Sequence, residues 1–175
     1  KATDPGLPQL LDKAMKLIED ENPSLKGVLY REFSRLALEQ GKLGELMNTL
    51  ARLKFNPEEH GSRDVFGEVY EYFLGQFAMS EGQRAGEFYT PKSVVNMLVE
   101  ILAPFKGKIY DPACGSGGMF VQSMKFKESH QKTLKKTGDL AVYGQEKIAE
   151  TRRLCLMNLA VHGMEGDLGS TYGST

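Results

Sequence analysis

The segment DPACGSGGMF, residues 111–120, places Asp111 four residues ahead of the first of three closely spaced glycines. Glycines at this density let a backbone come close to a ligand, because no Cβ atom stands in the way. The apolar pair Ile109–Tyr110 before the segment reads as a strand, and a helical pattern follows the glycines. This order puts backbone N–H groups and a carboxylate at the carboxyl edge of a sheet, where nucleotide-like ligands bind.

Three classes of ligand can be compared for this loop. A nucleoside triphosphate requires a Gly-Lys-Ser/Thr sequence, which the chain lacks, and a dinucleotide requires a third glycine where Met119 and Phe120 stand. S-adenosylmethionine has no phosphates and needs acceptors for its ammonium and ribose groups. Asp111 and Glu146 each end a predicted strand and meet those needs, although either alone would read as an ordinary turn or surface residue. Together they favour a nucleoside-type cofactor.

The elements around the loop read as the opening of a parallel α/β sheet. Residues 105–163 show the order strand, loop, helix, strand, helix. The second strand is predicted over Ala141–Tyr143 and the last helix over Ile148–His162, with Gly163 as the residue after its end. The tail GSTYGST, which starts at Gly169, is low in complexity and is expected to be disordered.

The part of the chain before this sheet reads as helices. Thr90-Pro91 predicts a helix start in which the Thr90 hydroxyl is the N-cap. Asp64 is expected to cap a helix that carries the apolar residues of 65–74. Residues 7–54 show apolar stripes at helical spacing, the second of them over Tyr30–Leu38.

Composition limits the class of protein. The chain has 175 residues, 41% of them hydrophobic and 26% charged, and a net charge of -1, which is typical of a soluble globular protein with one main core. No apolar run approaches the ~20 residues that cross a bilayer. The two cysteines, Cys114 and Cys155, form neither a disulfide framework nor a zinc spacing and suit a reducing cytosol. No metal site is visible in the sequence.

Four motifs, GEFYTP, DPACGSGGMF, YGQE and MNLAVHG, occur in an order that resembles the modification (methyltransferase) subunit of type I DNA restriction–modification systems. ENPSLKGVL and VYEYFLGQFA also resemble the N-terminal helical region of that family. The resemblance implies an α/β fold, a Rossmann-like S-adenosylmethionine-dependent methyltransferase core that is incomplete here. This core would cover residues 81–175, preceded by a helical region over residues 1–80.

The resemblance also implies which residues bind the cofactor. The EFYTPK segment approaches its methionine end, with Phe88 and Thr90 as the expected contacts. Asp111 is expected near the ammonium group and Glu146 at the ribose hydroxyls. The implied S-adenosylmethionine-binding residues are Glu87, Phe88, Tyr89, Thr90, Pro91, Lys92, Asp111, Ser116, Gly117, Gly118 and Glu146.

The activity implied by the resemblance is methylation of adenine N6 at specific sites in DNA. Enzymes of this kind hold the exocyclic amine of a flipped base with an Asn-Pro-Pro-aromatic motif, and no Asn-Pro-Pro occurs in this chain. No catalytic residue is therefore assigned, and the chain alone is expected to be inactive. The implied partners are DNA, a specificity subunit, a second modification subunit and a motor-nuclease subunit, in the cytoplasm and away from membranes.

Two other functions stay open on the residues alone. One is a methyltransferase of the same fold that acts on RNA or on a protein glutamine, and the other is a non-catalytic docking fragment. The lysines of residues 125–136 could contact DNA phosphates, but a solvated helix end is the favoured interpretation because Glu128 interrupts the run.

Overall fold

The computed structural model describes residues 4–36, 41–52, 62–81, 90–130 and 138–173, without the side chains of 62–64 and 77–81. The chain divides into two compact units, Lys1–Ser62 and Arg63–Thr175, which we call the N-terminal unit and the sheet unit. Among the described helices, none has the length and apolar character to cross a membrane. A domain boundary at residues 80/81 stays a prediction.

The N-terminal unit is helical. It contains α1 (Leu7–Glu21), short 3-10 turns at Pro23–Leu25 and Phe33–Arg35, and α2 (Lys42–Arg52). The helix expected from the second apolar stripe is wrong in the part that is described. There the carboxylate of Asp12 accepts hydrogen bonds from the backbone N–H groups of Phe33, at 2.8 Å, and Ser34, at 3.1 Å, which favours a capped turn over a longer helix.

The sheet unit contains three parallel strands, β1 (Gly107–Asp111), β2 (Leu140–Gly144) and β3 (Gly166–Asp167). Their order is β1-β2-β3, with Asp111 opposite Gly144 at one end of the β1–β2 pair. The parallel pairing confirms the α/β prediction. No pattern in the sequence predicts β3, because two residues are too short for an alternating pattern.

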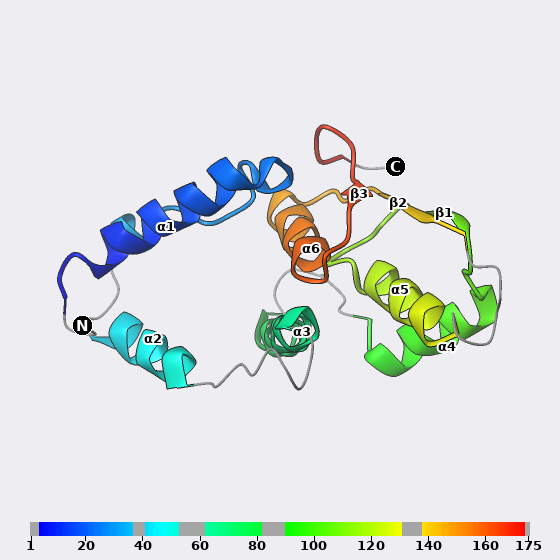
Figure 1. Ribbon diagram of the computed structural model, residues 1–175, viewed down its shortest axis with the longest axis horizontal. Helices are drawn as coiled ribbons and strands as arrows, with labels where there is room; N and C mark the ends of the chain where they lie inside the picture. The colour runs from blue at the N-terminus through cyan, green and yellow to red at the C-terminus, as the bar shows by residue number, and fades with distance from the viewer. Residues whose placement is uncertain (1–3, 37–40, 53–61, 82–89, 131–137, 174–175) are drawn as a thin grey trace. The chain divides into compact units, whose positions relative to one another are not determined.

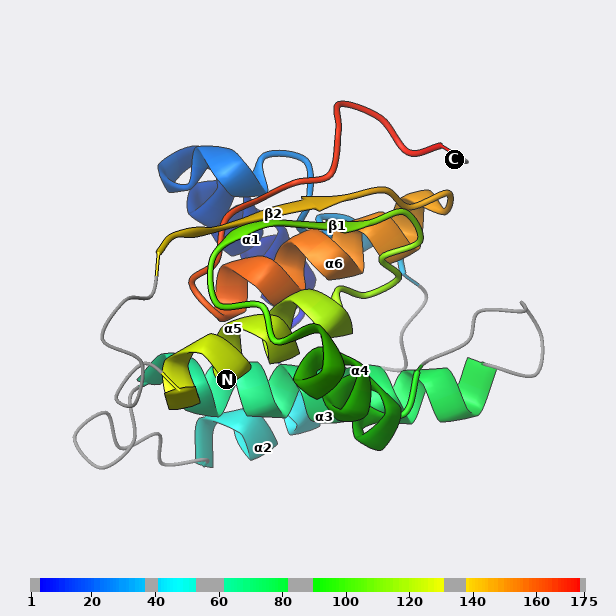
Figure 2. The same cartoon turned by 90° about the vertical axis from the view of Figure 1, so that its right-hand side faces the viewer.

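Four helices of this unit frame the sheet: α3 (Ser62–Glu81), α4 (Lys92–Leu102), α5 (Gly118–His130) and α6 (Ala149–Val161). Figures 1 and 2 show α5 and α6 on the same face of the sheet, with α3 beyond them. Since α3 begins at Ser62, Asp64 lies inside its first turn, and the prediction that it caps the helix is wrong. The end of α6 is as predicted, because Gly163 has a φ of 66° and Met164 N–H donates to the Leu159 carbonyl at 2.8 Å.

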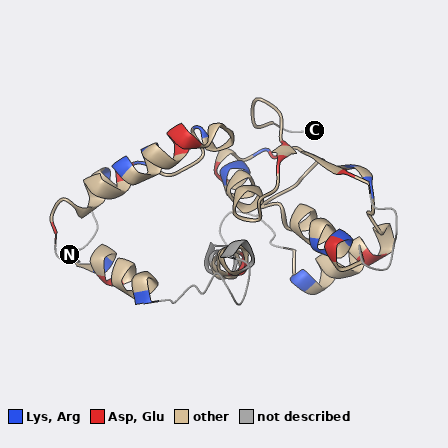
Figure 3. Cartoon of the chain, viewed as in Figure 1, with Lys and Arg blue, Asp and Glu red and all other residues tan. Residues whose placement is uncertain are grey.

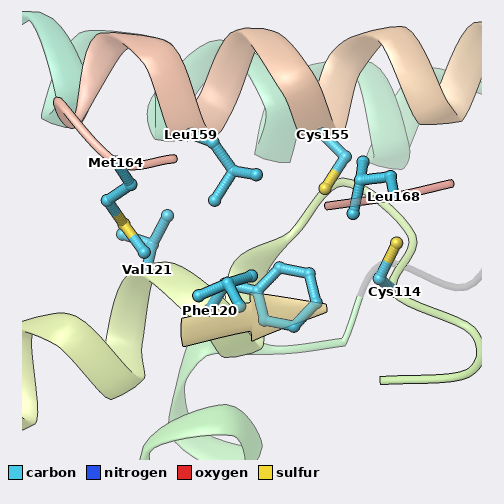
Figure 4. Packing of buried hydrophobic residues seen from close by; sticks show 8 residues of the cluster. Cys114, Phe120, Val121, Cys155, Leu159, Met164 and Leu168 are labelled. Carbon is cyan, nitrogen blue, oxygen red and sulfur yellow. The ribbon is translucent and has the colours of Figure 1, made fainter. Parts of the chain in front are cut away.

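The core fixes the loop after β1 against α6. Figure 4 shows the Phe120 ring among side chains from the loop, α6 and the segment around β3. Phe120 and Cys155 are 0% exposed and Leu159 is 2% exposed. Gly144 lies at the centre of this packing, since a Cβ there would approach the Leu168 side chain to 2.7 Å and Phe120 to 2.9 Å. The loop after β1 therefore packs against buried side chains that fix its position.

The chain after β3 is ordered as far as it is described, so the prediction of a disordered tail is wrong up to Gly173. Gly173 N–H donates to the Glu146 carbonyl at 3.0 Å, and the Gln145 side chain donates to the Gly173 carbonyl at 3.1 Å. The guanidinium of Arg152 donates to the Gly169 carbonyl. These contacts hold the segment beside the end of β2, and composition alone does not show them.

Candidate ligand-binding site

The glycine loop, residues 112–117, turns sharply between β1 and α5. Cys114 N–H donates to the Gln145 carbonyl at 2.9 Å and Gln145 N–H donates to the Asp111 carbonyl at 3.0 Å, so the pairing of the strands continues into the loop. Gly115 and Gly117 have φ values of 55° and 82°, in the region that glycine enters without strain. The loop needs glycine at both positions for its conformation.

Gly117 and Gly118, both expected to cradle the cofactor, have different surroundings. A Cβ on Gly117 would lie 2.8 Å from the Cys155 sulfur, so this buried glycine lets the loop pack on α6. A Cβ on Gly118 would meet no atom within 4 Å, because Gly118 borders an open cavity. The structure therefore places Gly118 at the cavity and Gly117 behind it.

The cavity has a volume of about 110 Å³ and lies where the end of β1, the glycine loop and the start of α4 come together. Its walls combine charged groups with apolar side chains. The lining residues are Glu71, Leu74, Thr90, Lys92, Val95, Asp111, Ala113, Cys114, Gly115, Ser116, Gly118, Met119, Gln122 and Asn158.

Asp111 presents a carboxylate to this cavity. Its Oδ1 accepts a hydrogen bond from Ala113 N–H at 3.0 Å, which fixes the side chain in a turn across the first residues of the loop. Among the described residues, Oδ2 has no hydrogen-bond partner. A half-buried carboxylate with one oxygen available is suited to bind a cationic group of a ligand.

Glu146 has a structural role that the sequence did not reveal. Its Oε2 accepts a hydrogen bond from Gly115 N–H at 3.0 Å, and its Oε1 accepts one from Ile148 N–H at 2.9 Å. The side chain thus ties the glycine loop to the start of α6. Glu146 does not border the cavity, and contact between this residue and ribose hydroxyls stays a prediction.

Thr90 and Lys92 bring the start of α4 to the cavity. The N-cap residue of α4 is Pro91, with no side-chain hydrogen bond, so the prediction of Thr90 as a hydroxyl cap is wrong. The proline carbonyl instead accepts the N–H groups of Val94 and Val95, at 2.9 and 3.1 Å. The Thr90 hydroxyl is then not used by the helix end. Glu87, Phe88 and Tyr89 lie outside the described residues.

Glu71 of α3 also lines the cavity, and sequence reasoning missed it. Its side chain is 15% exposed and lies within 3.5 Å of basic groups from Lys92, Lys125 and His162. Burial acts to raise the pKa of Glu71, but the hydrogen bonds from His162 and Lys125 and the charges of both lysines outweigh it and hold the pKa at about 2. The only signal in the sequence is a glutamate inside the otherwise apolar stretch 69–74.

Asn158 of α6 is a second missed residue at the cavity, and it is 1% exposed. Its side-chain N–H donates to the Ser116 carbonyl at 2.8 Å, so α6 supports the loop from behind. Its Oδ1 is buried and has no hydrogen-bond partner among the described residues. We assign Asn158 to holding the loop, since this bond fixes the backbone of Ser116.

Two remaining sequence features have structural roles. Cys114 borders the cavity but is buried, and its interaction with Cys155, together with burial, raises the pKa of the Cys155 thiol. In the basic run, Lys125 contacts Glu71 at 2.9 Å. Figure 3 shows both signs of charge on α5, while Lys132, Lys135 and Lys136 lie outside the described residues, so the interpretation of a solvated helix end stays a prediction.

Comparison with known proteins identifies relatives that match most of the chain. The sequence model of the N-6 DNA methylase family matches residues 61–175. The type I restriction enzyme HindI methylase subunit of Haemophilus influenzae is 41% identical over 171 residues, which cover 94% of this chain and 38% of that protein. The chain therefore spans well under half the length of this relative.

Solved structures show the same fold. The type I restriction-modification methyltransferase subunit of Streptococcus thermophilus matches with a TM-score of 0.68 at 24% identity, covering 93% of this chain and 36% of that one. A Listeria monocytogenes protein assigned to the class I S-adenosylmethionine-dependent methyltransferases matches with a TM-score of 0.52 at 18% identity, covering 95% and 52%. These likenesses confirm the predicted methyltransferase-type core behind an N-terminal helical region.

Proposed function

The chain belongs to the N-6 DNA methylase family, and from this premise we propose that it forms the cofactor-binding part of a DNA adenine-N6 methyltransferase subunit. The cofactor would be S-adenosylmethionine, bound with its methionine end in the cavity beside the glycine loop. The whole protein would be the modification subunit of a type I restriction–modification system, since its relative from Haemophilus influenzae is named a type I restriction enzyme methylase subunit.

One observation carries the cofactor proposal: opposite charges line the same small cavity. Asp111 supplies a carboxylate, Lys92 supplies an ammonium group, and Thr90 supplies a hydroxyl. The methionine end of S-adenosylmethionine is a zwitterion, whose ammonium would face Asp111 and whose carboxylate would face Thr90 and Lys92. A neutral or purely anionic ligand would leave the Asp111 carboxylate without a cationic partner.

The size of the cavity agrees with this orientation. Its volume of about 110 Å³ is below the ~300 Å³ at which whole-ligand pockets begin, so it suits one end of the cofactor. Ser116 and Gly118 border it, and Gly118 leaves room for close approach of the ligand. Contacts of Glu87, Phe88 and Tyr89 with the methionine end, and of Glu146 with the ribose, remain part of the proposal.

When bound, the cofactor supplies an activated methyl group. The residues of this chain bind and orient it: Asp111 fixes the ammonium, while Thr90 and Lys92 fix the carboxylate. No Asn-Pro-Pro occurs in this sequence, so we assign no residue here to the adenine amine. The chain alone is expected to bind the cofactor without transferring the methyl group.

The proposed assembly follows from the family and the relative together. We expect the full protein to act on DNA in the cytoplasm, with a specificity subunit, a second modification subunit and a motor-nuclease subunit. Methyl transfer from labelled S-adenosylmethionine by the full protein with its specificity subunit tests this. The label is expected in N6-methyladenine after DNA digestion, and label in RNA or in protein glutamine would contradict the proposed substrate.

The cofactor is tested separately by equilibrium dialysis of the protein against S-adenosylmethionine, NAD⁺ and ATP. Binding of the first ligand alone is expected, because only that ligand has the zwitterionic end that matches Asp111 and Lys92. Binding of either nucleotide in place of S-adenosylmethionine would refute the assignment of the glycine loop.

A further inference from the structure

Helix α3 contacts the other helices of the sheet unit through Gly67, Tyr70 and Glu71. Gly67 packs against the His162 ring, so closely that a Cβ at this position would overlap it. The Tyr70 hydroxyl donates to the Leu154 carbonyl of α6 at 3.1 Å. Glu71 follows on the same side. Figures 1 and 2 place α3 on the far side of α5 and α6 from the sheet.

The Glu71 carboxylate contacts basic groups from three different helices. Its Oε1 lies 2.9 Å from Lys125 Nζ of α5 and 3.5 Å from His162 Nε2, at the end of α6. Its Oε2 lies 3.2 Å from Lys92 Nζ, on the first residue of α4. One oxygen therefore anchors the carboxylate to α5 and α6, while the other faces α4.

Lys92 depends on this contact for its position. Its side chain is 58% exposed, and a lysine at such a site ordinarily samples many rotamers. Among the described residues, Glu71 is its hydrogen-bond partner, at 3.2 Å. The anchored carboxylate thus holds the Lys92 ammonium at the wall of the cavity.

We propose that Glu71 is a positioning residue that holds Lys92 and the start of α4 so that they receive the carboxylate of the ligand. The inference rests on the proposed function, since it takes the ligand to be S-adenosylmethionine. Glu71 does not contact the cofactor in this account. It acts through Lys92, and it makes the site selective for ligands that carry a carboxylate.

Two effects of Glu71 on an anionic ligand oppose each other. Its negative charge weakens the attraction of Lys92 and Lys125 for a carboxylate, whereas its fixed oxygen orders the Lys92 side chain. Lys125 neutralises part of the charge of Glu71 from behind, because it pairs with Oε1 and does not line the cavity. We take the ordering of Lys92 to be the larger effect, because a disordered lysine would lose rotamer entropy on binding.

The test is calorimetric titration of the protein and of Glu71→Gln with S-adenosylmethionine and with its decarboxylated analogue. The expected result is a Kd for S-adenosylmethionine about tenfold weaker in the variant, with the analogue within about twofold of the parent. Glu68→Gln is the matched control, because Glu68 is exposed on the same helix and is expected to change neither Kd. Thermal unfolding verifies that each variant is folded.

The other outcomes overturn the inference in distinguishable ways. Equal weakening of both ligands would mean that Glu71 contacts the ammonium or only supports the fold. Tighter binding of S-adenosylmethionine to Glu71→Gln would mean that Glu71 competes with the ligand for Lys92. A parent that binds the analogue but shows no preference for S-adenosylmethionine would also overturn it. A parent that binds neither ligand would instead refute the proposed function.

A second variant covers the case in which Glu71→Gln does not fold. Lys92→Met removes the ammonium and leaves the bonds of Oε1 to α5 and α6 in place. It is expected to lose the preference for S-adenosylmethionine over the analogue by the same factor. Unchanged preference in Lys92→Met would contradict the role given to this pair of residues.

Discussion

Glu146 Oε2 accepts a hydrogen bond from Gly115 N–H at 3.0 Å, so a residue just after β2 holds the loop that follows the neighbouring strand β1. Its other oxygen accepts Ile148 N–H at 2.9 Å, just before α6. Glu146, which the sequence predicts to contact ribose, therefore also links the glycine loop to the start of α6. Variants of Glu146 are expected to change stability as well as binding.

Glu146→Gln replaces one carboxylate oxygen by an amide that cannot accept a backbone N–H. One of the two N–H groups then loses its partner, and the free energy of unfolding is expected to fall by about 1–3 kcal/mol in chemical denaturation. Glu150→Gln, an exposed change in the first turn of α6, is the control and is expected to cost less than about 1 kcal/mol. Equal losses of unfolding free energy in the two variants would contradict the role of Glu146 in linking the glycine loop to α6.

Substitutions at the adjacent Gly117 and Gly118 are expected to differ in their effects on stability and on ligand binding. Gly117→Ala forces a φ of 82° on alanine and pushes its methyl to 2.8 Å from the Cys155 sulfur, so a loss of about 2–4 kcal/mol in unfolding free energy is expected. Gly118→Ala meets no atom within 4 Å and is expected to leave stability within about 1 kcal/mol of the parent.

Of the two glycine variants, Gly118→Ala is the one expected to lose affinity for the ligand without losing stability. The methyl group of Gly118→Ala enters the space beside the cavity, so weaker binding of S-adenosylmethionine is expected although the protein is folded. Full affinity in Gly118→Ala would show that the ligand does not approach this part of the loop.

The stabilising effect of Glu71 should depend on pH. Its pKa is lowered from 4.5 to about 2 in the folded protein, so the folded state binds this proton more weakly than the unfolded state does. The contribution is complete above about pH 4.5 and is lost as the pH falls toward 2. The difference in unfolding free energy between the parent and Glu71→Gln is therefore expected to shrink between pH 5 and pH 2.5 (roughly the range set by the two pKa values). A constant or growing difference would contradict the assigned ion pairs.

The docking of α3 rests in part on the Tyr70 hydroxyl. Tyr70→Phe removes its bond to the Leu154 carbonyl and leaves that carbonyl without this partner, and it is expected to lower the unfolding free energy by about 1–2 kcal/mol. Tyr72→Phe is the control, because Tyr72 is 63% exposed. A change as large in the control would show that the hydroxyl bond is not the cause.

Local patterns in the sequence predicted the elements that carry the site. The strand before Asp111, the helix after the glycines and the end of α6 at Gly163 follow from short-range chemistry, and the structure contains all of them. Predictions were wrong where a distant side chain decides the outcome. The Asp12 side chain of α1 accepts a hydrogen bond from Phe33 N–H, and the Glu146 carbonyl after β2 accepts one from Gly173 N–H.

Glu71 and Asn158 were not predicted as site residues for the same reason, because their partners are distant in the sequence. Glu71 has its partners on α4, α5 and α6, and no spacing in the sequence connects these positions. Asn158 supports a loop that precedes it by a whole strand and helix. Thr90 was predicted as a cap from its type and from the following proline, but the proline itself occupies the cap position and leaves the hydroxyl to the cavity.

Asp111 is proposed to bind the ammonium group of S-adenosylmethionine, and the chain offers a matched pair of variants that tests this role. Asp111 and Asp167 both end strands, and the Oδ1 of each accepts the N–H group two residues later, at 3.0 and 2.9 Å. Only Asp111 lies at the described cavity. An asparagine keeps the accepting oxygen in both turns and removes only the charge.

The most direct measurement is calorimetric titration of the parent, Asp111→Asn and Asp167→Asn with S-adenosylmethionine. The expected result is binding by the parent, at least about tenfold weaker binding by Asp111→Asn, and unchanged binding by Asp167→Asn. Equal affinity of Asp111→Asn and the parent, or no binding by a folded parent, would contradict the role of Asp111 in binding the ammonium group.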